Sequence, residues 1–134
     1  MLNDNLDNFI IKKENFPILN KDSSLYDAIF LMNKHQLGTV CIVNDSYELL
    51  GIFTDGDLRR IFLTVQKPLS AILIQDIFEY MNDNPIYISN STSQTKIKVL
   101  GLMKKNKIWD IPILDGKRLY GYRHKVCKRK INIH

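Results

Sequence analysis

Apolar residues recur along the chain at two spacings, one helical and one typical of buried strands. Leu25, Ala28, Ile29 and Met32 fall at i, i+3, i+4 and i+7, which is one face of an amphipathic helix. Residues 39–43, TVCIV, form a nearly continuous run of apolar and β-branched side chains, as expected of a strand buried on both faces. The pattern therefore predicts a helix followed directly by a buried strand.

The same pattern occurs a second time further along the chain. Three helix positions align at a constant offset of 71 residues: Ala28 with Val99, Leu31 with Leu102 and Met32 with Met103. After one residue is lost in a turn, Gly51 aligns with Gly121 at an offset of 70. Each half therefore holds a helix, an apolar strand, a tight polar turn and a second strand that contains a glycine.

Polar residues, glycine and proline mark the ends of these elements. Ser23 or Ser24 can cap the start of the first helix, and Gly38 lies just past its end. Short strands headed by Pro17 and Pro85 precede the two helices, because proline is tolerated where a strand begins. Each repeat thus reads β-α-β-β, and the first continues into a helix with the sequence DGDLRRIFLTV.

These elements predict an α/β fold of two pseudo-symmetric repeats. Asn-Asp at 44–45 and Asp-Gly at 115–116 supply the turns between neighbouring strands. Either half alone would leave one face of its sheet open, so we expect the two repeats to pack through their sheets into one module. The predicted divisions are a first repeat at 9–64, a linker with a short helix in QDIFEYM at 65–84, a second repeat at 85–124 and a basic tail at 125–134.

The stretch GIFTDGDLRR, residues 51–60, joins the end of a strand to the start of a helix. The free N–H groups and the positive dipole end of that helix favour an anion. Thr54 can donate to a phosphate oxygen, and Asp57 can accept from two adjacent hydroxyls such as those of a ribose. On the residues alone, a second interpretation stays open: Thr54 and Asp55 cap the helix and Asp57 favours its first turn electrostatically.

Other chemistry fits this stretch less well. A phosphate-binding P-loop needs lysine directly after its second glycine, where this chain has Asp57. The Asp-Gly-Asp sequence lacks the remaining oxygen ligands of a calcium loop. Nothing nearby supplies a nucleophile or a metal partner for the two carboxylates, so catalysis is disfavoured.

Composition and charge narrow the class of protein. The chain is 45% hydrophobic and 25% charged, the balance of a soluble globular domain, and it lacks a run long enough to span a membrane. Two cysteines, Cys41 and Cys127, predict a reduced, cytoplasmic protein. The net charge of +5 comes from residues 123–134, which hold five basic residues and no acid, because removing those five leaves 14 basic against 14 acidic residues. A solvated tail is therefore favoured over a nucleic-acid contact.

The paired β-α-β-β-α unit, with glycine, two residues, threonine, two residues and aspartate at its end, resembles the cystathionine-β-synthase (CBS) domain. The resemblance covers residues 9 to 124. It implies a nucleotide or related ligand between the two repeats, with Thr54 meeting phosphate and Asp57 the ribose hydroxyls. The candidate ligand-binding residues are Thr54, Asp57, Gly38, Thr39, Asp55, Arg59 and His124.

A narrower resemblance is to the C-terminal CBS pair of bacterial arabinose-5-phosphate isomerases. It rests on residues 51–60, on Leu37-Gly38, and on His124, which stands three residues after Gly121 where other CBS domains have threonine. A CBS pair fused to some sugar nucleotidyltransferases carries a similar TDGD run. Cys127 stands where a second ribose-binding aspartate is expected, so the resemblance implies at most one nucleotide site of the usual type.

The predicted function is a regulatory module that senses a nucleotide or nucleotide sugar, such as an adenylate or CMP-3-deoxy-manno-octulosonate. No required cofactor, bound metal or membrane partner is expected, and a homodimer is the expected assembly. One alternative is the regulatory portion of an arabinose-5-phosphate isomerase whose sugar-isomerase domain is absent from these residues, so that this chain alone is not an enzyme. Another alternative is a ligand-free dimerisation module.

Overall fold

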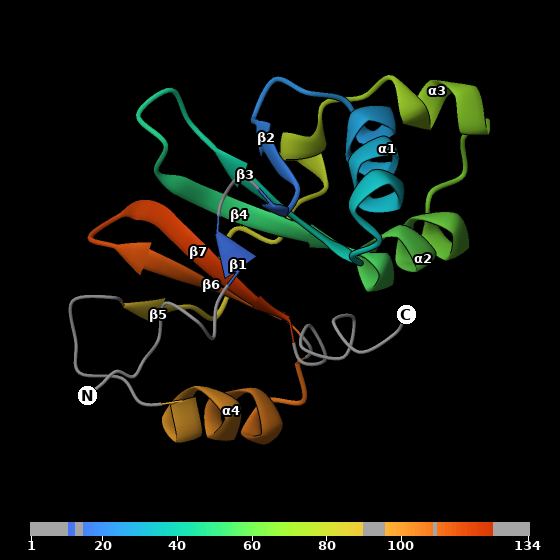
Figure 1. Cartoon of the computed structure of the whole chain (residues 1–134). Helices are drawn as coiled ribbons and strands as arrows, with labels where there is room; N and C mark the ends of the chain where they lie inside the picture. Colours follow the sequence, from blue (N-terminus) through green and yellow to red (C-terminus); the bar gives the residue numbers. More distant parts are fainter. Residues whose placement is uncertain (1–10, 13–14, 90–95, 109, 125–134) are drawn as a thin grey trace. The chain divides into compact units, whose positions relative to one another are not determined.

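The structure is a computed structural model that describes residues 11–12, 15–89, 96–108 and 110–124 of the chain (Figure 1). It divides into two compact units. The first-repeat unit is Phe16–Pro85, and the second-repeat unit holds the described residues from Ile86 onward together with residues 11–12 and Asn15. Each unit combines helices with one sheet, which confirms the predicted α/β class.

The first-repeat unit carries a three-stranded sheet in the order β2-β3-β4, with helices α1, α2 and α3 beside it (Figure 1). Strands β2 and β3 are parallel, and β3 and β4 are antiparallel. Its elements are β2 (Ile18–Asn20), α1 (Leu25–His35), β3 (Thr39–Val43), β4 (Leu49–Thr54), α2 (Asp55–Thr64), α3 (Leu69–Leu73) and the 3-10 helix η3 (Ile77–Glu79). All five residues of β3 are buried, as its apolar run predicts.

The second-repeat unit carries a four-stranded sheet in the order β1-β7-β6-β5. Strands β5 and β6 are parallel, and β7 is antiparallel to both β6 and β1. Its elements are β1 (Ile11–Lys12), β5 (Ile88–Ser89), α4 (Lys96–Lys105), β6 (Asp110–Asp115) and β7 (Arg118–His124). Val99 and Met103 of α4 are buried in its core, as Ala28 and Met32 of α1 are in the first.

Strand register confirms that the two repeats are structurally equivalent. Thr39 pairs with Thr54 at the ends of β3 and β4, and Asp110 pairs with His124 at the ends of β6 and β7. Each hairpin contains one register shift, between residues 42 and 43 in the first and between 113 and 114 in the second. Gly116 adopts the left-handed conformation with φ 66°, which suits the predicted Asp-Gly turn.

Both ends of α1 agree with the prediction. Ser24 caps the N-terminus: its Oγ accepts from the Asp27 N–H at 3.1 Å, while an Asp27 carboxylate oxygen accepts from the Ser24 N–H at 3.0 Å. The helix ends at Gln36 in the left-handed conformation, and the Gln36 side chain also donates to the carbonyl of Asn33. Gly38 therefore lies just past the helix end, although Gln36 is the residue that forms the left-handed cap.

Two segments pair or pack outside the repeat to which the sequence divisions would assign them. Residues 11–12, inside the predicted range 9–64, form strand β1, which pairs with β7 of the second-repeat unit, Ile11 opposite Tyr122. The expected linker at 65–84 is part of the first-repeat unit, where Ile72 and Ile77 are buried in the core. The backbone N–H of Ile77 donates to the Ser23 carbonyl, which ties the predicted helical turn, η3, to the start of α1.

Tyr80 shows how this segment is held. Its hydroxyl donates to a side-chain oxygen of Gln75, and its ring packs against the core of the first-repeat unit. Partial burial, and then the neighbouring Glu79 carboxylate, raise the pKa of the Tyr80 phenol above its ordinary value. The phenol therefore stays a hydrogen-bond donor at neutral pH.

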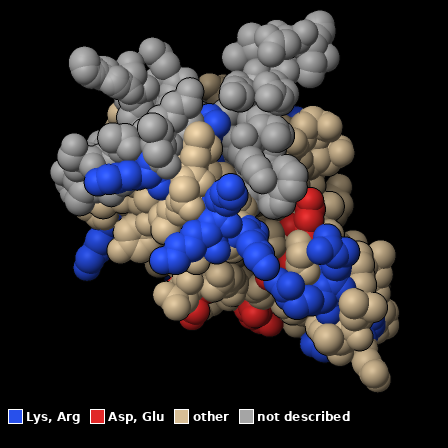
Figure 2. All heavy atoms as spheres, turned by 90° about the horizontal axis from the view of Figure 1, so that it is seen from below, with Lys and Arg blue, Asp and Glu red and all other residues tan. Residues whose placement is uncertain are grey.

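Lysines collect on α4 and its C-terminal end. Lys98, Lys104, Lys105 and Lys107 are exposed, and Figure 2, which views the structure from the side of α4 in Figure 1, shows Lys and Arg side chains at this surface. Positive charge at a helix C-terminus is favourable, as for Lys104 and Lys105 in the last turn of α4. The basic tail itself lies outside the described residues.

Candidate ligand site

The register of β3 and β4 brings two separated parts of the sequence together. Thr39 lies opposite Thr54 across the hairpin, and the backbone N–H of Asp55 donates to the Gly38 carbonyl at 2.9 Å. Helix α2 therefore begins beside the first residue of β3. This contact assembles four predicted site residues, Gly38, Thr39, Thr54 and Asp55, at one end of the sheet.

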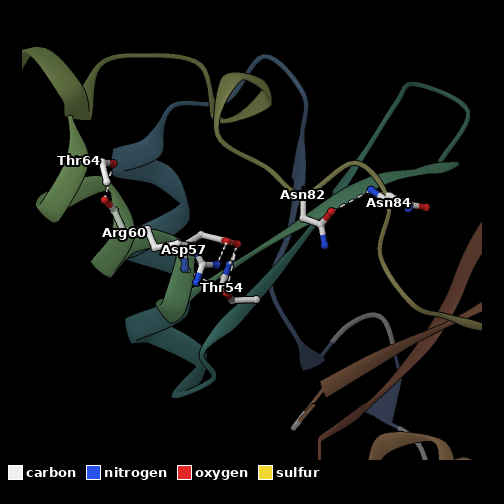
Figure 3. A network of polar contacts seen from close by, with 6 residues as sticks. All are labelled: Thr54, Asp57, Arg60, Thr64, Asn82 and Asn84. Atoms are coloured by element: carbon white, nitrogen blue, oxygen red, sulfur yellow. Dashed lines mark hydrogen bonds and ion pairs between the residues drawn. The ribbon is translucent and has the colours of Figure 1, made fainter. Parts of the chain in front are cut away.

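Thr54 and Asp57 form a reciprocal capping box at the start of α2 (Figure 3). The Thr54 Oγ1 accepts from the Asp57 N–H at 3.3 Å. The Oδ2 atom of Asp57 accepts from the Thr54 N–H at 2.9 Å and from its hydroxyl at 3.1 Å. The capping interpretation is thus confirmed, with Asp57 rather than Asp55 as the partner of Thr54.

Arg60, rather than the predicted Arg59, contacts this box. Its Nη2 donates to Oδ1 of Asp57, one helical turn earlier (Figure 3). The side chain of Arg60 is 68% exposed, whereas that of Asp57 is 17% exposed. Arg59 is also exposed. The spacing from Asp57 to Arg60, i to i+3, is the signal that distinguishes the two arginines, because residues three apart are neighbours on a helix surface.

Gly38 lies close to the exposed side chain of Asp55. A Cβ atom at this position would lie 2.4 Å from Oδ2 of Asp55 and 3.1 Å from its Cγ. Both residues line a cavity of about 330 Å³ between the C-terminal end of α1 and the start of α2. Its remaining lining residues are Ile29, Met32, Asn33, Gln36, Leu37 and Leu58. An apolar floor with a carboxylate and two amides at its rim can hold a small organic molecule.

Two further predicted site residues are Thr39, which is buried, and His124, which lies in the second-repeat unit. Thr39 is 1% exposed, so its side chain is part of the interior of the first-repeat unit. His124 ends β7 in the second-repeat unit, and its side chain lies outside the described residues. The predicted ligand role of His124 therefore stays a prediction.

The described residues contain no group of three or more His, Cys, Asp or Glu side chains that could hold a metal ion. Within the same residues a membrane-crossing helix is not found, and α1, the longest, has 11 residues. Cys41 is a free, buried thiol in β3.

Comparison with known proteins agrees with this geometry. The CBS domain family matches residues 10–64. Over most of the chain the fold is that of CBSX2 from Arabidopsis thaliana, solved in complex with AMP, at 20% identity and a TM-score of 0.75, covering 92% of this chain and 93% of that one. The CBS domain pair of protein MJ0100, solved with 5′-methylthioadenosine and S-adenosyl-L-methionine, gives 21% identity and a TM-score of 0.74, covering 93% and 96%.

The chain therefore contains a CBS domain at residues 10–64 and has the fold of a CBS domain pair. Within this class, it is 31% identical over 111 residues to the arabinose 5-phosphate isomerase KdsD of Escherichia coli K12. That match covers 83% of this chain and 32% of KdsD, so the chain spans about a third of the length of the curated relatives it matches. The two resemblances stated from the sequence are thus confirmed.

Proposed function

We propose that the chain is a regulatory module that binds a nucleotide or nucleotide sugar at the start of α2. The observation that carries this proposal is the arrangement of Thr54 and Asp57. Their side chains are held by each other at a helix N-terminus, and Asp57 keeps an acceptor position on Oδ1. A carboxylate there can bind ribose hydroxyls, and the helix end favours the phosphate beside them.

The similarity to KdsD supports a more specific ligand. A module that belongs with a sugar-phosphate isomerase would respond to a product of the same pathway, and CMP-3-deoxy-manno-octulosonate carries both a ribose and a phosphate. We propose that this chain regulates such an isomerase domain in the cytoplasm. Regulation requires that two arrangements of the module bind the ligand unequally, because a ligand with equal affinity for both shifts nothing.

A thermal-shift panel on the purified chain tests the ligand. The panel contains AMP, S-adenosylmethionine, CMP and CMP-3-deoxy-manno-octulosonate. A ligand that binds only the folded state raises the melting temperature, through about 2.7 kcal/mol of stabilisation at a hundredfold excess over its dissociation constant. The CMP sugar is expected to give the largest shift. A flat response to all four compounds would instead support the ligand-free dimerisation module.

A homodimer is the proposed assembly, through the helices of the first-repeat unit. Large apolar side chains are exposed on this unit: Tyr26, Phe30, Phe62, Leu63, Leu69, Ile74 and Phe78. A large exposed apolar surface marks a protein interaction site, and a second copy of the chain brings a matching apolar surface.

Sedimentation velocity tests the dimer with two exposed aromatic residues. Phe62 on α2 is 55% exposed, and Tyr87 in the second-repeat unit is 53% exposed. Phe62→Asp is expected to convert a dimer to a monomer, because it places a charge in an apolar interface. Tyr87→Asp serves as the matched control and is expected to leave the dimer intact. A monomeric wild-type chain at micromolar concentration would contradict the proposal.

A further inference from the structure

The Asp57 carboxylate has almost no free acceptor capacity in this structure. A carboxylate offers about four lone-pair positions. Oδ2 already accepts from the N–H and the hydroxyl of Thr54, and Oδ1 accepts from Arg60. One position is left on Oδ1. A ribose presents two adjacent hydroxyls, so binding both requires one of the existing donors to leave.

Arg60 is the donor that can leave most easily. The contact from the Thr54 N–H belongs to the capping box, and the Thr54 hydroxyl is held beside Oδ2 because its oxygen also accepts from the Asp57 N–H. The guanidinium of Arg60 is instead largely in water, at 68% exposure of its side chain, and it is joined to Asp57 by a surface ion pair. Water replaces such a contact at little cost.

The displaced guanidinium would remain beside the first turn of α2. Both Nη atoms of Arg60 lie 3.7 Å from the position that a Cβ on Gly56 would occupy, so the guanidinium lies against this turn. The N–H of Gly56 points the same way as the other N–H groups of the turn and has no i−4 carbonyl within the helix. An anionic group at this place gains a charge-assisted contact from Arg60 as well as the helix end.

We infer that Arg60 makes the site selective for ligands with an anionic group next to the ribose. Without ligand, Arg60 donates to Oδ1 of Asp57. With ligand bound, Arg60 contacts the anionic group instead. This inference rests on the proposed function. A nucleotide replaces the Asp57 contact of Arg60 with a contact to phosphate. A neutral nucleoside must displace Arg60 without that replacement and therefore binds weakly.

Calorimetric titration of AMP against adenosine, and of CMP against cytidine, tests the inference. In the wild-type chain each nucleotide is expected to bind at least about 10-fold more tightly than its nucleoside, the scale of one charge-assisted hydrogen bond. In Arg60→Gln the nucleotide is expected to bind about 10-fold more weakly and the nucleoside about 2- to 3-fold more tightly, since Asp57 is no longer blocked. These opposite changes separate selectivity from simple damage to the site, which would weaken both ligands.

Two other variants complete the test. Lys67→Gln removes one positive charge from the same unit at an exposed position and is expected to leave the ratio of the two affinities unchanged. If Arg59→Gln collapses the ratio and Arg60→Gln does not, the inference is wrong and Arg59 is the selective residue. If Arg60→Gln weakens the binding of nucleotide and nucleoside equally, the inference is also wrong. If the wild-type chain binds none of the four compounds, the inference is wrong, whereas the proposed function is decided separately by the thermal-shift panel that includes the CMP sugar.

Discussion

Replacing Asp57 with alanine is expected to abolish ligand-induced stabilisation of the chain. The substitution removes the only carboxylate in the Thr54–Asp57–Arg60 network, and with it both acceptors for the ribose hydroxyls. Hydrogen bonds to a charged group contribute about 1.5–3 kcal/mol each, so the loss of two predicts an affinity reduced by about 100-fold or more. The measurement is the melting temperature with and without the ligand that gives the largest shift to the wild-type chain.

Asp57→Ala also removes a helix cap, and α1 provides the matched control. Asp27 makes the same reciprocal box with Ser24 that Asp57 makes with Thr54, in the same unit. Each alanine variant is expected to lose about 0.5–2 kcal/mol of stability without ligand. Only Asp57→Ala is expected to lose the ligand-induced shift. Equal shifts in both variants would mean that Asp57 is a capping residue alone.

Replacing Gly51 with alanine is expected to destabilise the first-repeat unit by about 1–3 kcal/mol, because it overpacks a closed space. Gly51 is buried in β4, and a Cβ on it would lie 2.5 Å from the Asn82 carbonyl oxygen and 2.8 Å from the Met81 sulfur. Moving the Asn82 carbonyl away would break backbone hydrogen bonds. Its oxygen accepts from the Ile52 N–H at 3.0 Å, and the Asn82 N–H donates to the Ile52 carbonyl at 2.7 Å. Urea unfolding of the variant measures the loss.

Gly56, five residues later in the same motif, is the control for this variant. A Cβ on Gly56 would lie 3.6 Å from the Thr54 hydroxyl oxygen, which is ordinary contact, and the residue is inside helix α2. Gly56→Ala is therefore expected to be neutral or to stabilise the chain by up to about 1 kcal/mol, the usual helical preference for alanine. A loss in Gly56→Ala as large as that in Gly51→Ala would show that the contact with residues 81–82 is not the cause.

Sequence reasoning reached most of the fold because the relevant signals are local. The helical spacing from Leu25 to Met32, the apolar run of β3 and the Asp-Gly turn each act within a few residues, and the structure contains all three elements. Because the two repeats align at a nearly constant offset, the elements predicted for the first half also predict those of the second half. The same reasoning found Thr54 as the first residue of the capping box, because capping residues act over one helical turn.

The candidate site was predicted less completely. The segment 65–84 carries little apolar periodicity, so its docking through Ile72 and Ile77 was not expected. The choice between Arg59 and Arg60 depends on side-chain direction around α2, which a run of two arginines does not reveal. The left-handed cap of α1 is Gln36, a residue that the local sequence does not single out, whereas Gly38 lies just past the helix end as predicted.

The sequence by itself determined the repeated architecture, the class of each main element and the position of the capped helix start. Only the tertiary structure decided that β1 pairs with β7, that Gly51 must lack a side chain because of Asn82, and that Gly38 lies beside Asp55. The physical reason is the range of the interactions. Periodicity and capping act between neighbours in the chain, whereas close packing and strand pairing act between residues that only folding brings together.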